Sequence, residues 1–332
     1  MGERSTRNAI GVLEAAYAVA ATEDEWLEGL IASVEPGLAR GFGICAYVYD
    51  ARSLPLKVRS LVATGPRELA AITRDAIEIS SANAAYVDAT WRTQSFATVS
   101  ETVDMTKIEA ARGYVSAGMN DILIVNGYDV SGVGVWLGAP LPEARRPTIA
   151  ERRTWSRIGS HLAAALRLRN ATTPRPSAAV LTPKGKVEHA EGAAKVRDAR
   201  EALQDAVMGM ERARGPMRKR DAEGAVEQWK PMVHAHWSLL EQFERDGKRY
   251  IVAVENASWM EAPELLAPRE RQVVAAAVAG RSNKLIAYEL GLSHSTVRVL
   301  LARAAKKLRV KTRQELIAAY SARVRPPPPA DE

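Results

Sequence analysis

The chain has 332 residues, of which 47% are hydrophobic and 26% are charged, and these ordinary globular values exclude wholesale disorder. Its single cysteine, Cys45, excludes an intrachain disulfide and any cysteine-rich zinc or iron–sulfur site. The five histidines lack the HExxH spacing of a metallohydrolase, and no apolar run approaches the roughly 20 residues of a membrane span. We therefore expect a reduced, cytoplasmic protein with no metal site, no cofactor and no membrane segment.

The positive charge is concentrated at one end of the chain. The formal net charge is +7, yet residues 263–325 contain 13 Lys and Arg against 4 Asp and Glu. The rest of the chain is therefore close to neutral. A basic C-terminal module joined to a near-neutral domain is typical of a protein that binds a polyanion such as nucleic acid.

The first 170 residues are predicted to form one α/β unit with an antiparallel sheet. The expected elements are helices at about 7–20 and 24–38, strands at 41–50 and 56–63, helices near 67–80 and 106–118, strands at 121–126 and 132–137, and a closing helix from 148 to about 170. Thr148 and Glu151 match a capping box at the start of that closing helix. This order of helices around a small antiparallel sheet resembles a GAF-type (or PAS-like) sensory domain, which implies a small-molecule or protein signal of unknown identity.

The middle of the chain is predicted to be a linker followed by a small α+β segment. Residues 171–186 hold three prolines and little periodicity, as a linker does. The segment 187–258 begins with a polar helix over about 187–213, and its two strand-like runs, 237–244 and 249–255, are joined through Asp246-Gly247. Asp-Gly between two such runs is a strong hairpin signal. The sequence assigns no function to this segment.

Residues 263–325 are predicted to form an all-α domain of four short helices. The helices begin at Pro268, after Ser282, after Ser293 and at Thr312, where Thr312 and Glu315 form a second capping box. The second and third helices are separated only by residues 291–293, which is the spacing of a helix-turn-helix.

The third helix has two different faces. One face is an apolar stripe of Val297, Leu300, Leu301, Ala304 and Leu308. The opposite arc carries small and basic residues, namely Ser295, Arg298, Val299, Ala302, Arg303 and Lys306. An arginine there can donate two hydrogen bonds to a guanine, and Val299 can touch a thymine methyl group. Lys284, at the start of the second helix, is placed for a phosphate.

Residues 266–318 resemble the LuxR/FixJ-type helix-turn-helix of bacterial transcription regulators. The matching pieces, in order, are Pro268-Arg-Glu-Arg271, the GxSNKxIA run 280–287, Leu290-Gly-Leu-Ser293, Thr296-Val-Arg298, Lys307-Leu308 and Thr312-Arg313. The resemblance implies that the third helix reads the major groove and that the fourth supports dimerisation. By position, Arg298, Val299 and Ala302 face bases, and Lys284 and Thr296 lie near the DNA backbone.

Three residues depart from the family pattern. Ala267 replaces a Thr cap, Leu285 replaces an acidic residue, and Leu300, which we assign to the core, replaces a His. None of these changes removes the basic face. The expected function is therefore a transcription regulator that binds double-stranded DNA as a homodimer, contacts RNA polymerase and responds to a signal. We expect the helix 149–170, together with the fourth helix, to hold the dimer.

Two other classes of function stay open. The C-terminal helices could form a protein-interaction module (for a scaffold, polymerase or kinase) whose DNA affinity is incidental, or the N-terminal unit could be an enzyme with an appended regulator. The sequence has no GxGxxG, P-loop or GxSxG motif, so we predict that it is not an enzyme. Structural roles are expected for several other polar side chains, which are Cys45, Asp121, Asp129, His161, His234, His236 and Glu270.

Overall fold

The structure, a computed structural model, describes residues 8–93, 95–101, 104–170, 177–243, 247–256 and 266–324. Within these ranges no helix combines the length and the apolar character that crossing a membrane requires. The proline run 326–329, which the sequence predicts to be a projecting tail, lies outside the described residues.

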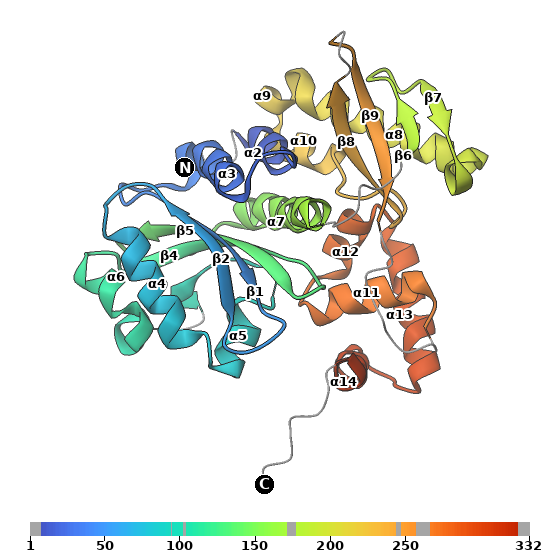
Figure 1. The fold of residues 1–332 in the computed structure, drawn as a ribbon. Coiled ribbons are helices and arrows are strands. Elements are labelled where there is room, and N and C mark those ends of the chain that lie inside the picture. The colour runs from blue at the N-terminus through green and yellow to red at the C-terminus, as the bar shows by residue number, and fades with distance from the viewer. Residues whose placement is uncertain are drawn as a thin grey trace.

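The N-terminal unit is built on a five-stranded antiparallel sheet with the order β2-β1-β5-β4-β3 (Figure 1). Its strands are β1 (Cys45–Asp50), β2 (Lys57–Ala63), β3 (Ser95–Thr98), β4 (Asp121–Tyr128) and β5 (Val133–Leu141). Four of them correspond to predicted strands, whereas β3 was not predicted. At only four residues, β3 is too short to carry a clear periodic pattern.

Helices cover both faces of this sheet. One face packs on α2 (Ala9–Ala16), α3 (Glu23–Leu38) and α7 (Ile149–Arg169), and the other on α4 (Leu69–Ser80), α5 (Ala84–Thr90) and α6 (Arg112–Ser116). Successive residues of β5 therefore enter different cores: Val135 and Leu137 face the α7 side, and Trp136 faces the α4 side. With both faces buried, the strand has no polar face.

The helix predicted near 106–118 is broken into short pieces. Single 3₁₀ turns occupy Val99–Glu101, Met105–Lys107 and Glu109–Ala111, and only α6 is α-helical. The break falls at Ile108, whose φ of −104° and ψ of 127° are those of extended backbone. By contrast, the capping box at the start of α7 is confirmed, because the Thr148 hydroxyl accepts from the Glu151 amide and the Glu151 carboxylate accepts from the Thr148 amide.

A second antiparallel sheet, with the order β7-β6-β9-β8, follows in the chain. Its elements are β6 (Ser177–Leu181), β7 (Val187–Ala190), a 3₁₀ turn (Gly192–Lys195), α8 (Arg197–Arg212), a π-turn (Ala213–Met217), α9 (Arg218–Arg220), α10 (Ala222–Gln228), β8 (Trp237–Phe243) and β9 (Arg249–Glu255). The hairpin of β8 and β9 is confirmed.

The prediction that residues 171–186 form a linker is wrong for its second half. Strand β6 lies within that range and pairs with β9, with Leu181 opposite Ile251. The helix predicted over 187–213 is also wrong at its start, where β7 pairs with β6. Strand β6 owes its conformation to β9, which is about 70 residues further along the chain, and β7 owes its conformation to β6. The local pattern therefore did not reveal either strand.

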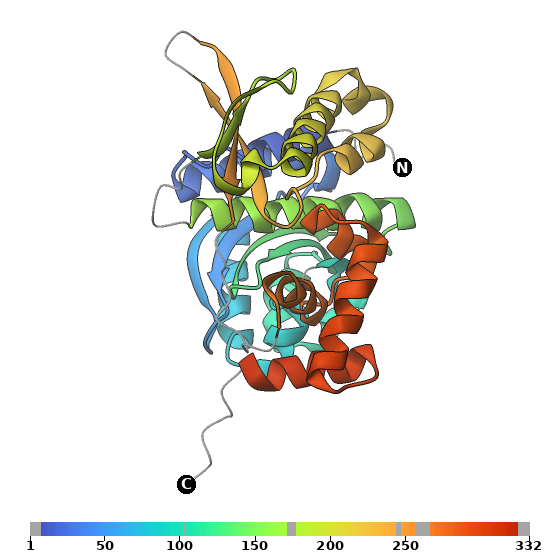
Figure 2. The same cartoon turned by 90° about the vertical axis from the view of Figure 1, so that its right-hand side faces the viewer.

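The two sheets share one hydrophobic core, with α7 between them (Figure 2). Leu123 of the first sheet, Trp155 of α7, Leu203 of α8 and Ile251 of the second sheet belong to the same cluster of buried side chains. The segments 1–170 and 187–258, predicted as separate domains, are therefore packed as one body. Because the chain itself buries most of α7, this helix offers little surface to a second copy, which speaks against its predicted role in dimerisation.

Candidate nucleic-acid interface

The C-terminal domain consists of the four predicted helices. They are α11 (Pro268–Val278), α12 (Asn283–Leu290), α13 (His294–Leu308) and α14 (Arg313–Val324). The serines expected as caps do cap their helices: Ser282 Oγ accepts from the amide of Leu285 at 3.2 Å, and Ser293 Oγ accepts from the amide of Thr296 at 3.0 Å. Glu315 likewise accepts from the amides of Lys311 and Thr312. These caps fix where each helix begins.

The turn between α12 and α13 depends on Gly291. Its φ of +60° lies in the left-handed region, where a side chain is strained. A Cβ atom at this position would also lie 2.2 Å from the carbonyl oxygen of Met232. The glycine therefore sets the angle between the two helices and lets the domain approach the preceding segment.

Helix α13 presents the predicted face to solvent. Its apolar stripe is buried, including Leu300, which is 9% exposed and confirms the assignment of this residue to the core. The opposite face is open, with Ser295, Arg298, Val299, Ala302, Arg303 and Lys306 all exposed and Thr296 partly buried. Val299 is 48% exposed, which is unusual for a large apolar side chain. Figure 1 shows α13 at the edge of the molecule, with α11 between it and the N-terminal sheet.

The basic side chains of α13 have no carboxylate partner in the described part of the chain. Arg298, Arg303 and Lys306 on α13, and Lys284 at the exposed start of α12, form no ion pair with any residue that the structure describes. Nearby cations are used differently: Lys307 binds Glu270 at 2.7 Å, and Arg313 donates to Asn283 and to the carbonyl of Arg281. We call the exposed side of α13 that carries Arg298, Arg303 and Lys306 the α13 face.

Two departures from the family pattern are accommodated by neighbouring groups. Ala267 has no hydroxyl, but the Glu270 carboxylate accepts from its amide at 2.9 Å, which retains half of a capping box. Glu270 thus has the structural role that the sequence suggested. Leu285 is partly buried and packs against the shared core of the two sheets.

The comparisons with known proteins bear on this domain. Residues 264–320 match the family model GerE, described as bacterial regulatory proteins of the luxR family. Residues 264–320 form a LuxR-family helix-turn-helix domain. The chain is also 37% identical over 83 residues to the "Transcriptional regulatory protein FixJ" of Rhizobium meliloti (strain 1021). That match covers 24% of this chain and 41% of FixJ, so the chain spans less than half of that relative.

The LuxR-family domain is docked on the rest of the chain through Tyr288, which the sequence analysis did not single out. The Tyr288 hydroxyl lies 2.6 Å from the carbonyl oxygen of Val226 and 2.8 Å from that of Trp229. It also lies 2.9 Å from Nε2 of His161 on α7. Arg157 and Lys230 lie over the tyrosine ring, at 5.2 and 4.5 Å from its centre. We call this set of groups around Tyr288 the Tyr288 cage; its members are His161, Arg157, Val226, Trp229 and Lys230.

A second contact consists of four buried charges. Asp129 and Arg167 pair at 2.5 Å in the N-terminal unit, and Arg281 and Glu289 pair at 2.9 Å in the LuxR-family domain. Arg281 crosses between the two by donating to the carbonyl of Tyr128. Burial raises the pKa of Glu289, while the neighbouring Arg281 charge opposes that rise. No short motif marks the pair of Asp129 and Arg167, whose members are 38 positions apart, or the contact that joins it to the pair in the LuxR-family domain.

His161 is fully buried, and its role is structural as expected. Its Nδ1 lies 3.0 Å from the Tyr17 hydroxyl, and Nε2 lies 2.9 Å from the carbonyl of Trp229. Two of the other histidines, His234 and His236, lie in a turn, with φ of +50° at His234. Across the described part of the chain, no three His, Cys, Asp or Glu side chains gather as a metal site would require.

The burial of His161 predicts that stability falls in mild acid. Burial lowers its pKa from 6.5 to about 3, although the Trp229 carbonyl partly offsets this effect. Because the unfolded chain then binds more protons between these pH values, stability is complete above pH 6.5 and is lost as the pH falls below it. We expect the free energy of unfolding in urea to drop by roughly 2 kcal/mol from this residue between pH 7.5 and 5.

The control for this prediction is His161→Gln, which removes the titrating group and retains a hydrogen-bonding side chain. Its unfolding free energy should change less with pH than that of the original chain. Glu289 titrates in both proteins, so its contribution cancels in the difference. An equal pH dependence in the two proteins would contradict the prediction.

Proposed function

We propose that the chain is a transcription regulator that binds double-stranded DNA by placing α13 in the major groove. The observation that carries the proposal is the α13 face, on which Arg298, Arg303 and Lys306 are exposed and form no ion pair with a described residue, within a LuxR-family domain. Arg298 and Val299 contact bases, and Ala302 lets the helix approach the groove closely. Lys284, Ser295, Thr296 and Lys306 contact the phosphate backbone.

The protein acts as a homodimer on two half-sites about one helical turn apart. Since α7 is covered within the chain, the dimer contact is assigned to α14 alone. Gln314 and Ala318 are exposed there and, being four residues apart, lie on one face of the helix. RNA polymerase in the cytoplasm is a further expected partner.

The N-terminal unit is proposed to be a sensory domain of GAF or PAS type, with a regulatory rather than a catalytic role. Support comes from its antiparallel sheet order, β2-β1-β5-β4-β3, and from the helices on both faces. A signal would reach α13 through the Tyr288 cage, because α12 carries Tyr288 at one end and leads through Gly291 into α13. A change at the cage would then alter the spacing of the two DNA-reading helices.

Selection of binding sites from a random DNA pool with the full-length protein tests the proposal. We expect an enriched palindromic site, because a symmetric dimer binds symmetric half-sites. Arg298→Ala should lose the preference at one position of each half-site, at a cost of about 1–3 kcal/mol there.

A matched control is Arg197→Ala, which removes an exposed arginine on α8, outside the LuxR-family domain. It should leave the selected site unchanged. If no site is enriched, or if Arg298→Ala weakens all sequences equally, the protein does not read sequence through Arg298. That outcome would favour the alternative of a protein-interaction module with incidental DNA affinity.

A further inference from the structure

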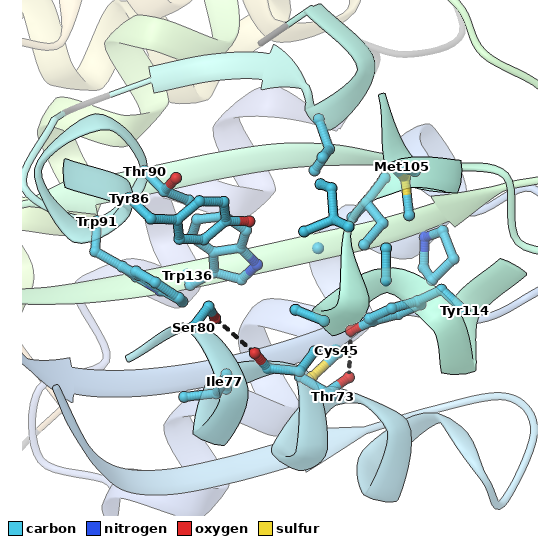
Figure 3. Close-up of a pocket in the computed structure, with 18 of the residues that line it drawn as sticks. Cys45, Thr73, Ile77, Ser80, Tyr86, Thr90, Trp91, Met105, Tyr114 and Trp136 are labelled. Atoms are coloured by element: carbon cyan, nitrogen blue, oxygen red, sulfur yellow. Dashed lines mark hydrogen bonds between the residues drawn. The ribbon is translucent and has the colours of Figure 1, made fainter. Parts of the chain in front are cut away.

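A cavity of about 60 Å³ lies in the N-terminal unit, between the first sheet and helices α4 to α6. Figure 3 shows Trp136, Tyr86 and Thr90 along one side of it and Met105, Tyr114 and Thr73 along the other. Among the described residues that line the cavity, no side chain carries a full charge. Burial raises the pKa of the Cys45 thiol to about 12, so this group is neutral as well. The cavity is therefore suited to an uncharged molecule.

One indole donor faces this cavity without an acceptor. Trp136 is 7% exposed, and its indole nitrogen has no hydrogen-bond partner among the residues that the structure describes. An indole N–H usually finds a partner, and this one is open to the cavity. An unpaired donor at a cavity wall is where a ligand's acceptor atom would bind.

The space in front of this donor comes from Gly138. A Cβ atom on Gly138 would lie 3.0 Å from the indole nitrogen of Trp136 and 3.4 Å from a methyl carbon of Ile122. The backbone of Gly138 does not adopt a positive φ, so its conformation does not require glycine. What the glycine provides here is the room beside the indole N–H.

Neighbouring aromatic side chains hold Trp136 in this orientation. The Tyr47 ring stacks on it, with centroids 5.8 Å apart and an angle of 17° between the planes. Tyr47 is itself fixed, since its hydroxyl accepts from the indole nitrogen of Trp91 at 2.8 Å. The donor is thus oriented before any ligand binds, which lowers the entropic cost of binding.

We propose that this cavity binds a compact, uncharged carbonyl compound whose oxygen accepts a hydrogen bond from the indole N–H of Trp136. The aromatic walls contact the apolar part of the molecule, and Gly138 leaves room for the oxygen. An engineered cavity of about 150 Å³ holds benzene, which has six non-hydrogen atoms, so the smaller cavity here limits the ligand to roughly two to four non-hydrogen atoms. The site rests on the sensory role proposed above and would be where the signal binds.

The indole N–H resonances of the ¹⁵N-labelled full-length protein provide the test, with acetone as the probe. The resonance of Trp136 is identified by its absence in Trp136→Phe, among those of the seven tryptophans. Saturable binding should move it downfield, because a carbonyl acceptor deshields the donor proton. Propane, which has the same carbon skeleton and no acceptor, should produce no downfield shift.

Two variants complete the test. Trp136→Phe keeps an aromatic ring and should weaken acetone binding about five- to ten-fold, the effect of one hydrogen bond. Gly138→Ala should abolish the shift, and its unchanged resonances from the other tryptophans would show that it folds. An unmoved Trp136 resonance, or equal binding by all three proteins, would overturn the proposal. These measurements contain no DNA, so a negative result would not bear on the proposal that α13 binds DNA, which the site selection tests separately.

Discussion

Replacing Asp129 by alanine should destabilise the protein by about 3–5 kcal/mol, the usual cost of leaving one member of a buried ion pair alone. Asp129 is fully buried, and its carboxylate accepts from Nε of Arg167 at 2.7 Å and from the amide of Ser131 at 2.9 Å. Burial raises the pKa of Asp129, but Arg167 and Ser131 outweigh burial and keep that pKa below its usual range. Without the carboxylate, the Arg167 charge would remain buried without Asp129, its direct ion-pair partner, although Glu289 of the second pair still acts on it.

Urea denaturation of the full-length protein measures this loss, and a double variant separates charge from packing. In Asp129→Leu with Arg167→Met both charges are absent, so no buried charge is left unpaired. The double variant should be more stable than Asp129→Ala, because two apolar side chains can replace an ion pair at little cost. If the double variant is as unstable as Asp129→Ala, the loss of stability comes from poorer side-chain packing and not from an unpaired charge.

Raising the salt concentration from 50 to 200 mM should weaken binding to the selected DNA site by roughly three orders of magnitude if about six phosphates are contacted. The reason is the release of counterions when lysines and arginines neutralise phosphates. The α13 face and Lys284 provide such cations, and none of them has a carboxylate partner in the described chain that would have to be displaced first.

Fluorescence anisotropy with labelled DNA over a series of salt concentrations gives the slope of log K against log salt. Lys306→Ala should reduce that slope by about 1 and weaken all sequences alike, since Lys306 is assigned to a phosphate. Arg197→Ala should leave it unchanged. Binding that does not depend on salt would contradict a DNA-reading role for the α13 face.

The C-terminal domain was predictable because its determinants are local. Caps such as Ser282 and Ser293, the turn at Gly291 and the stripe of α13 all act within about four residues along the chain. Each could therefore be identified from the sequence, and the exposed face of α13 followed from the helical phase. The roles of Arg298 and its neighbours in binding DNA stay predictions.

The remaining features depend on contacts between distant residues. Strand β6 exists because β9 pairs with it, and the segment 171–186 alone resembled a linker. The hairpin pattern predicted that Trp136 lies on a strand, yet it could not indicate which core the side chain enters, because both faces of the strand are buried. The Tyr288 cage brings Tyr288 against His161, which is 127 positions away in the chain, and no short sequence motif indicates such a contact.

The docking of Tyr288 has a consequence for the exchange of domains between proteins. Helix-turn-helix domains are often treated as interchangeable DNA-binding units that can be fused to any other domain. Here Tyr288 and Arg281 are 5% and 1% exposed. The Tyr288 hydroxyl contacts the carbonyls of Val226 and Trp229, and Arg281 donates to the carbonyl of Tyr128. Joined to a foreign N-terminal unit, this domain would carry an aromatic ring and a cation with no matching surface. The LuxR-family domain is therefore fitted to the rest of its own chain, and the two parts must be exchanged, or must diverge, together.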